Sequence, residues 1–545
     1  MSSALAPSAP TRRERAHAAL SPWFLLLMGG VLSGAMLVLA GDDLILKCAA
    51  LFTIWLFAAA SCRFELTHPY VWYGLFYMLY GVSGPLLQAL DMHPLGFWGG
   101  RDVSQLDFSY VLDLEYIGLL VLLIVIGPQL MNLRDGAADG MKAVIFGGLG
   151  PVLAVSLGVL GLLLFEIYSQ GFQSKGEVTL YGSWITRFGF AYNLVVVSLT
   201  VLLFKLVSDG RIPMAYALIG VIVLLAAGSV FVSGQRNFLF RFAISAYVLI
   251  HITHRRIPWS AALVILAASL ILIVWLGGQK MSLMGQTLDI GAVDLNAIDP
   301  ASLPEKYASI LLDPPVIQYL KLFALLAFGT ELMTASNNLA LIVDRVPHDL
   351  PYLNGATLFV ADIARAILPG FIVGNSIPTS MMTYHNAFFG EQVEMGLGPG
   401  YTLLGAGYMN FGPPGVVMIA ALFGVVLRFL YRWAGRSALG FLFYIGFIPI
   451  GAYATRMDIS APISQGLKHV LMPLIAMAVI GALRGCRSST PDRRSAAERR
   501  AAAHVPSRHP NRDRRTTVDD RRRIGNRRAG KRTSAADRTA PAEES

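Results

Sequence analysis

Twelve mostly apolar stretches dominate this chain of 545 residues. A helix needs about 20 apolar residues to cross the hydrocarbon core of a bilayer, and most of these stretches approach that length. Charged residues make up only 14% of the chain, against about 25% in typical soluble proteins. The pattern predicts an all-α polytopic integral membrane protein with about twelve transmembrane helices, at 23–40, 44–61, 70–90, 111–131, 144–165, 190–208, 214–233, 238–252, 260–276, 412–431, 439–455 and 465–484.

The longest interruption of this pattern runs from residue 277 to residue 411 and separates the first nine expected helices from the last three. A connection of that length is usually functional, so we expect it to carry the working surface. Its apolar segments at 316–333 and 355–375 predict interfacial or re-entrant helices, which membranes tolerate where protein buries the backbone. The expected organisation is an N-terminal segment (1–21), transmembrane helices 1–9 (22–276), the long loop (277–411), transmembrane helices 10–12 (412–484) and a basic tail (485–545).

The distribution of basic residues predicts the orientation of these helices, because cytoplasmic loops carry an excess of Lys and Arg. The long loop, counted over 277–410, holds 5 Lys and Arg against 11 Asp and Glu. Connections on the opposite side are rich in basic residues: Arg63, Arg134, Lys142, Lys205, Arg211, Arg255, Arg256, Arg428, Arg432 and Arg436. We therefore expect a multi-pass protein with a periplasmic long loop and both termini in the cytoplasm.

The segment after the last expected helix has a different composition. From Arg487 to Ser545 the chain holds 17 Lys and Arg against 8 Asp and Glu, with few large apolar residues. Such a segment cannot bury enough apolar surface to offset the entropy of ordering, so the composition predicts a disordered cytoplasmic tail. Anchoring of the tail to anionic lipid is the alternative interpretation.

The chain has no motif for nucleotide or metal chemistry. It contains no phosphate-binding P-loop, no dinucleotide-binding glycine fingerprint and no acidic pair of the kind that holds a metal for a nucleotide sugar. The three cysteines, Cys48, Cys62 and Cys486, show neither a disulfide framework nor zinc spacing. We therefore expect no cofactor, no metal site and no nucleic-acid partner.

Three arginines are candidates for binding an anionic group. Arg236 lies in the short turn 233–237, Arg241 lies a full turn inside the next expected helix, and Arg365 lies in an apolar part of the long loop. A guanidinium binds phosphate oxygens in a bidentate manner and stays charged, so such residues suit a lipid diphosphate. Anchoring to lipid headgroups is the alternative for Arg236, and an ion pair with Asp362 is the alternative for Arg365. Arg241 fits neither alternative well, because charge inside a membrane is costly.

A possible base comes from the same loop, where His385 and Asn386 follow a stretch rich in Ser, Thr and Met. An imidazole titrates near neutral pH and can take a proton from a hydroxyl group. The alternative interpretation of His385 is an ordinary surface residue. Glu331 and Asp362 are weaker candidates for the same role.

Three stretches resemble the Wzy-type oligosaccharide repeat-unit polymerases, also called O-antigen polymerases. Ser233–Asn237 resembles their outward Gly-x-Arg turn, Ile363–Pro369 resembles their Ile-Pro-Arg-x-x-x-Pro segment, and Tyr408–Val416 resembles the Tyr-x-Asn-Phe-Gly-x-x-Gly-Val that opens a late span. The likeness covers roughly residues 210–435. The chain departs from the pattern at Ala364, in place of a proline, and at Ala406, where relatives often have an acidic residue.

The resemblance implies a metal-independent glycosyltransferase at the periplasmic face of a bacterial inner membrane. Its substrates would be undecaprenyl-diphosphate-linked oligosaccharide repeat units, and its product would be an O-antigen or exopolysaccharide. A flippase, a chain-length regulator and membrane lipid are the implied partners. We assign catalytic roles to Arg236, Arg365 and His385, and substrate contacts to Arg241, Asn237, Asn386, Tyr408, Asn410 and Glu331.

Two other functions stay open. The pair His385 and Asn386 also resembles the His-Asn motif of the related O-antigen ligases, which transfer glycan from the same donor to lipid A core. A non-enzymatic polysaccharide transporter or flippase is the second alternative, and it predicts internal repeats with functional charges near the middle of the membrane. In this chain the candidate charged residues and the long loop are instead expected on one side of the membrane.

Overall fold

The computed structural model describes residues 21–91, 97–170, 190–233, 237–258, 332–368, 377–390 and 400–488. Within these residues, six helices are long and apolar enough to cross a membrane: Pro22–Ala40, Leu44–Ser61, Phe108–Ile126, Met141–Val159, Pro413–Ala434 and Ser460–Gly485. This confirms an α-helical protein of transmembrane character. The number of twelve spans stays a prediction, and the expected span at 260–276 lies outside the described residues.

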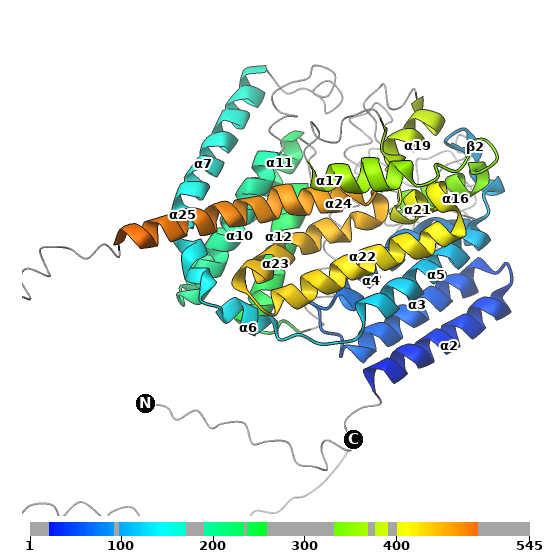
Figure 1. Cartoon of the computed structure of the whole chain (residues 1–545), viewed down its shortest axis with the longest axis horizontal. Coiled ribbons are helices and arrows are strands. Elements are labelled where there is room, and N and C mark those ends of the chain that lie inside the picture. Colours follow the sequence, from blue (N-terminus) through cyan, green and yellow to red (C-terminus); the bar gives the residue numbers. More distant parts are fainter. Residues whose placement is uncertain are drawn as a thin grey trace, which may run out of the picture. The chain divides into compact units, whose positions relative to one another are not determined.

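The elements follow one another along the chain as in Figure 1. The longer helices are α2 (Pro22–Ala40), α3 (Leu44–Ser61), α4 (Pro69–Ala89), α5 (Phe108–Ile126), α7 (Met141–Gln170), α10 (Phe190–Ser208), α11 (Ile212–Ser233), α12 (Asn237–Thr253), α22 (Pro413–Ala434), α23 (Ala438–Ala452) and α25 (Met472–Ser488). Between and beside them lie β1 (Phe97–Trp98), β2 (Arg101–Asp102), η1 (Val103–Gln105), α6 (Leu133–Ala138), α16 (Thr334–Arg345), η3 (Thr357–Ala364), α17 (Arg365–Ile367), α19 (Ser380–Phe388), α21 (Leu403–Phe411), η4 (Ala454–Arg456), α24 (Ser460–Gln465) and η5 (Gly466–Leu471).

Helix α5 shows how local chemistry sets the boundaries of a span. We expected it at 111–131, but it runs from Phe108 to Ile126. The carboxylate of Asp107 accepts a hydrogen bond from Tyr110 N at 2.9 Å, which caps the start of the helix. Gly127, with a φ of 73°, ends it in a conformation that favours glycine. Apolar content alone placed both ends too late, because it does not register these caps.

The long helices pack against one another in two places. In Figure 1, α2, α3, α5 and α22 lie in one row, and α25 crosses α7, with which it is in contact. Gly148 of α7 lies so close to α25 that an added Cβ would come within 1.9 Å of Met477 O. Small residues at such contacts let helix backbones approach, which is a common way of joining helices in membranes.

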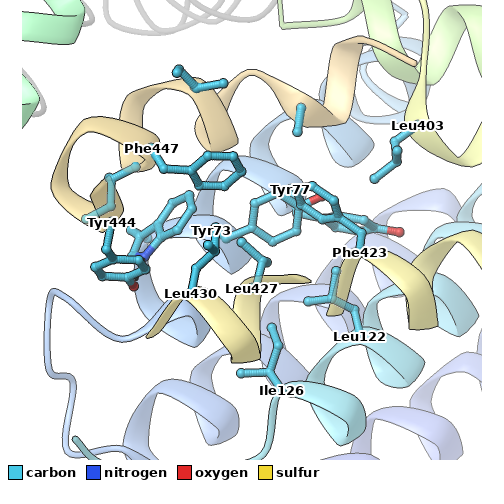
Figure 2. Packing of buried hydrophobic residues seen from close by; sticks show 14 of the residues in the cluster. Tyr73, Tyr77, Leu122, Ile126, Leu403, Phe423, Leu427, Leu430, Tyr444 and Phe447 are labelled. Atoms are coloured by element: carbon cyan, nitrogen blue, oxygen red, sulfur yellow. Dashed lines mark hydrogen bonds between the residues drawn. The ribbon is translucent and has the colours of Figure 1, made fainter. Parts of the chain in front are cut away.

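Large aromatic side chains fill the interior between these helices. Figure 2 shows Tyr73 and Tyr77 of α4 against Phe423 of α22, with Leu122 of α5 beside them. The Tyr77 hydroxyl donates to the backbone oxygen of Glu115 at 3.0 Å. A buried tyrosine that finds such a partner adds packing area without leaving a polar group unpaired. This explains why α4, with its many tyrosines, belongs to the interior of the bundle.

The described part of the long loop packs into the bundle. Its helix α16, which we did not predict, is buried along most of its length and packs against α4 and α5. The Ser336 hydroxyl accepts a hydrogen bond from Gly84 N at 3.1 Å, at a point where α4 has no side chain to separate the two backbones. The apolar segment at 355–368 forms the π-helix η3 and the single turn α17, while residues 316–331 lie outside the described residues.

A two-stranded hairpin in the 91–110 connection, which was also not predicted, is attached to the same helix. Strands β1 and β2 pair antiparallel, with Trp98 opposite Arg101. Trp98 Nε1 donates to Asn338 Oδ1 at 2.9 Å, and Arg101 Nε lies 2.7 Å from Asp344 Oδ2. The first and second halves of the chain are therefore joined at this end of the bundle.

The two ends of the bundle differ in charge. Asp43 and Asp107 lie at the starts of α3 and α5. Arg428 and Arg432 lie near the end of α22, where Arg428 Nη1 donates to Val125 O at 3.1 Å, and Arg134 lies in α6. We call the end of the bundle that carries Arg134, Arg428 and Arg432 the basic end. Its cytoplasmic position stays a prediction.

Candidate functional site

Asn410, in the stretch Tyr408–Val416, is bonded to the segment that directly precedes the stretch Ile363–Pro369. It lies at the end of α21 and is 1% exposed. Its Oδ1 accepts hydrogen bonds from Gly355 N at 3.1 Å and Thr357 Oγ1 at 2.8 Å. Its Nδ2 donates to Ala406 O at 2.8 Å and to Ser380 Oγ at 3.3 Å. These bonds use the full capacity of an amide side chain, so Asn410 positions the backbone around it.

Aromatic contacts strengthen the same junction. Leu353 N donates to Met409 O at 2.9 Å, and the rings of Tyr352 and Tyr408 lie 6.4 Å apart. The rings of Phe359 and Phe411 lie 6.2 Å apart. The segment before Arg365 is therefore held against the Tyr-x-Asn-Phe-Gly stretch along its length. Tyr408 was predicted to contact substrate, and its side chain is buried within this junction.

Asp362 extends the polar network towards α19. It is fully buried in η3, three residues before Arg365. Its carboxylate accepts hydrogen bonds from Ser380 N at 3.0 Å and Ser380 Oγ at 2.6 Å. Ser380 in turn contacts Thr357 Oγ1 at 3.3 Å, so the network closes on itself. π-helical turns are uncommon and often occur at functional sites, and here the turn aims Asp362 at the start of α19.

His385 is half-buried on α19 and is not an ordinary surface residue. Its Nε2 lies 2.6 Å from Gly400 O. A carbonyl oxygen only accepts, so Nε2 carries the hydrogen and the lone pair of the neutral ring lies on Nδ1. Burial lowers the pKa of His385 below its ordinary value, while Gly400 and Asp458 act in the opposite direction. The ring is therefore neutral at pH 7, in the form that can accept a proton.

Asp458 is a site residue that the sequence analysis missed. It is 1% exposed and lies just before α24, where it accepts hydrogen bonds from Ser460 Oγ at 2.5 Å and Ala461 N at 3.0 Å. Burial raises the pKa of its carboxyl, and the nearby His385 acts to lower it. The Asp-Ile-Ser order at 458–460 is a helix-start signal that the apolar run after it obscured.

Arg241 contacts the short helix α24, which begins just after Asp458. It lies in α12 and is 9% exposed, and its Nη2 donates to Gln465 Oε1 of α24 at 2.6 Å. Arg241 and His469 line a cavity with room for about one water molecule, among valine and leucine side chains. The alternative of a headgroup anchor does not apply to this arginine, because its guanidinium points into protein.

Helix α24 is thus the element around which the site is built. Asp458 caps the start of α24 and interacts with His385. Gln465, at the end of α24, accepts the hydrogen bond from Arg241. The helix also packs against α17, the turn that carries Arg365. The backbone of Arg365 is described, but its side chain is not. Arg236 and Glu331 lie outside the described residues, as does the side chain of Asn237.

The remaining predicted residue, Asn386, is exposed on α19 beside His385. No group of three or more His, Cys, Asp or Glu side chains gathers within metal-binding reach in the described ranges. The arrangement offers a neutral imidazole, two buried carboxyl groups and a buried guanidinium close to one helix. Comparison of the chain with protein-family models, with curated proteins and with solved structures finds no match.

Proposed function

We propose that this protein is a membrane-embedded glycosyltransferase that polymerises undecaprenyl-diphosphate-linked oligosaccharide repeat units at the periplasmic face of a bacterial inner membrane. The observation that supports this best is the convergence of separate parts of the chain on helix α24. Asn410 is bonded to the segment that leads into Arg365, the turn α17 that carries Arg365 packs against α24, and α12 reaches α24 through Arg241. Residues far apart in the chain thus surround one helix, as a site for a single substrate requires.

The proposed reaction needs positioning and charge stabilisation. A hydroxyl oxygen of the incoming unit attacks the anomeric carbon of the nascent chain and forms the new glycosidic bond. The bond from that carbon to the lipid diphosphate breaks, and its electron pair leaves with the diphosphate. Guanidiniums stabilise the charge that develops there. His385 accepts the hydroxyl proton on Nδ1, and Asp458 steadies the resulting imidazolium.

A deletion strain distinguishes the proposed polymerase from its alternatives. Loss of a polymerase leaves single repeat units on the lipid core, loss of the ligase leaves none there, and loss of a flippase blocks export. Gel electrophoresis of the surface polysaccharide distinguishes these three outcomes. Purified protein with lipid-linked repeat units should also give a polymer ladder in EDTA. A ladder that requires a divalent metal would contradict the metal-independent reaction.

The pH dependence of the reaction tests the role of His385. The neutral ring is the base, so the rate should fall as the pH falls through the pKa of His385. Because burial lowers that pKa, we expect the acidic limb of the profile to lie below pH 6.5, the ordinary histidine value. The measurement is the initial rate of ladder formation across pH.

His385→Gln can preserve a hydrogen bond to Gly400 O but cannot take a proton, so it should be slow and lack the acidic limb. Asn386→Ala, on the exposed side of α19, is the control and should keep the limb. An unchanged limb in His385→Gln would show that another group is the base.

A further inference from the structure

A second polar pocket lies at the basic end of the bundle, away from the candidate site. Helix α12 extends from the candidate site to this pocket, because Arg241 lies in its first turns and His251 lies in its last turn. The pocket has a volume of about 490 Å³ and opens to the outside. It is formed where the α3–α4 turn, the α5–α6 connection and the end of α12 meet, and its polar lining is Glu65, Thr67, Asn132, Arg134, His251 and Arg256.

One wall of the pocket holds an ionised carboxylate whose first oxygen is already bonded. Glu65 Oε1 lies 3.5 Å from His251 Nε2 and accepts a hydrogen bond from Thr67 Oγ1 at 3.3 Å. The hydrogen bond with His251 lowers the pKa of Glu65, so the carboxylate is charged at neutral pH. His251 Nδ1 accepts a hydrogen bond from Ile257 N at 3.0 Å, which requires the neutral ring with its hydrogen on Nε2.

Two guanidiniums supply the opposite charge. Arg134 Nε donates to Ile252 O at 2.9 Å, which fixes the side chain at the edge of the pocket and leaves its terminal nitrogens for a ligand. Arg256 also lines the pocket and interacts electrostatically with Glu65. With His251 neutral, these three charged side chains carry a net charge of +1. That charge matches the single negative charge of a phosphodiester.

The remaining lining is apolar and comes from Leu130, Met131, Leu133 and Ile252. The pocket also lies beside the ends of α3, α5 and α12, of which α3 and α5 are long and apolar enough to cross a membrane. Basic pockets between transmembrane helices are a common way of binding phospholipid headgroups. We propose that this pocket binds the phosphodiester of a phospholipid headgroup, with the phosphate on Arg134 and Arg256 and the glycerol against the apolar wall. This proposal does not depend on glycosyl transfer.

The test is binding of phosphatidylglycerol to the purified full-length protein, measured by native mass spectrometry across lipid concentration. We expect the double variant Arg134→Gln/Arg256→Gln to bind at least about tenfold more weakly, because it loses charge-assisted contacts to phosphate. The matched control is Arg432→Gln/Arg436→Gln, which removes the same charge outside the pocket lining and should bind as the parent protein does. Equal binding by the pocket variant and the parent would overturn the proposal.

A second variant guards against loss of folding. Glu65→Gln keeps the side-chain shape and raises the net charge of the pocket, so it should bind phosphatidylglycerol several-fold more tightly. Tighter binding cannot result from a damaged protein, and unchanged or weaker binding would count against the proposal. Competition distinguishes the ligand source: if millimolar inorganic phosphate displaces the lipid from this site, a free phosphate is the ligand and the lipid assignment is wrong.

Discussion

Replacing Arg365 by alanine is expected to slow polymer formation by about a hundred- to a thousandfold, and the same loss is expected for Arg236→Ala. Each arginine is proposed to hold a diphosphate, and loss of one preorganised charge contact commonly costs about 3–4 kcal/mol in the transition state. The measurement is ladder intensity from purified protein and lipid-linked repeat units, at equal protein concentration.

The lysine variants separate this role from simple anchoring. Lysine keeps the charge but loses the planar, bidentate geometry of the guanidinium. We therefore expect Arg236→Lys and Arg365→Lys to be poorly active, whereas anchors at lipid headgroups would tolerate lysine. Arg432→Lys, at the basic end of the bundle, is the control and should be fully active. Near-normal ladders from both Arg236→Lys and Arg365→Lys would show that these arginines act only as membrane anchors.

Asn410→Ala is expected to destabilise the fold and to lower activity together. The substitution leaves Gly355 N and Thr357 Oγ1 without the oxygen that they share. A buried polar group without a partner costs about 1–3 kcal/mol, and the substitution leaves Gly355 N in this state, while Thr357 Oγ1 keeps its contact with Ser380. Activity should fall as well, because the segment released by the substitution leads directly to Arg365. Thermal unfolding of the purified protein and ladder formation measure the two effects.

The matched control for stability is Asn386→Ala, which removes an exposed amide from a neighbouring helix. Exposed substitutions of this kind usually change stability by less than about 0.5 kcal/mol. A lower activity with normal unfolding in Asn386→Ala would support its predicted substrate contact. If Asn410→Ala unfolds at the same temperature as the parent protein, the bonds from Asn410 to the segment before Arg365 are not what holds the site.

The spans were predictable because their signals are local. The apolar runs at 23–40, 44–61 and 190–208 match α2, α3 and α10 closely, since hydropathy over about 20 residues measures whether a helix is stable in a membrane. The predicted boundaries of α5 were wrong because hydropathy does not detect the caps at Asp107 and Gly127, although these caps are also local sequence signals. The twelve-span count, the orientation and the glycosyl-transfer chemistry are still predictions from these signals and from the resemblance.

Helix α16 was beyond such reasoning. Its Asn337 and Asn338 are fully buried, yet in the sequence they read as parts of a polar loop. Their burial is favourable only because distant residues bond to this segment, for example Trp98 Nε1 to Asn338 Oδ1, across 240 positions of the chain. A buried polar group without its partner would be destabilising, and a local window cannot show whether the partner exists.

By itself, the sequence determined that the chain forms apolar helices, where most of them begin and end, and which arginines and histidine are candidates for chemistry. Only the tertiary structure decided that Arg241 meets Gln465, 224 residues further on, and that His385 is half-buried beside Asp458. Helix formation depends on neighbours within a few turns, whereas the protonation state and partner of a buried polar group depend on whatever packs against it. That packing brings α12, α17, α19 and α24 together, and no local pattern records it.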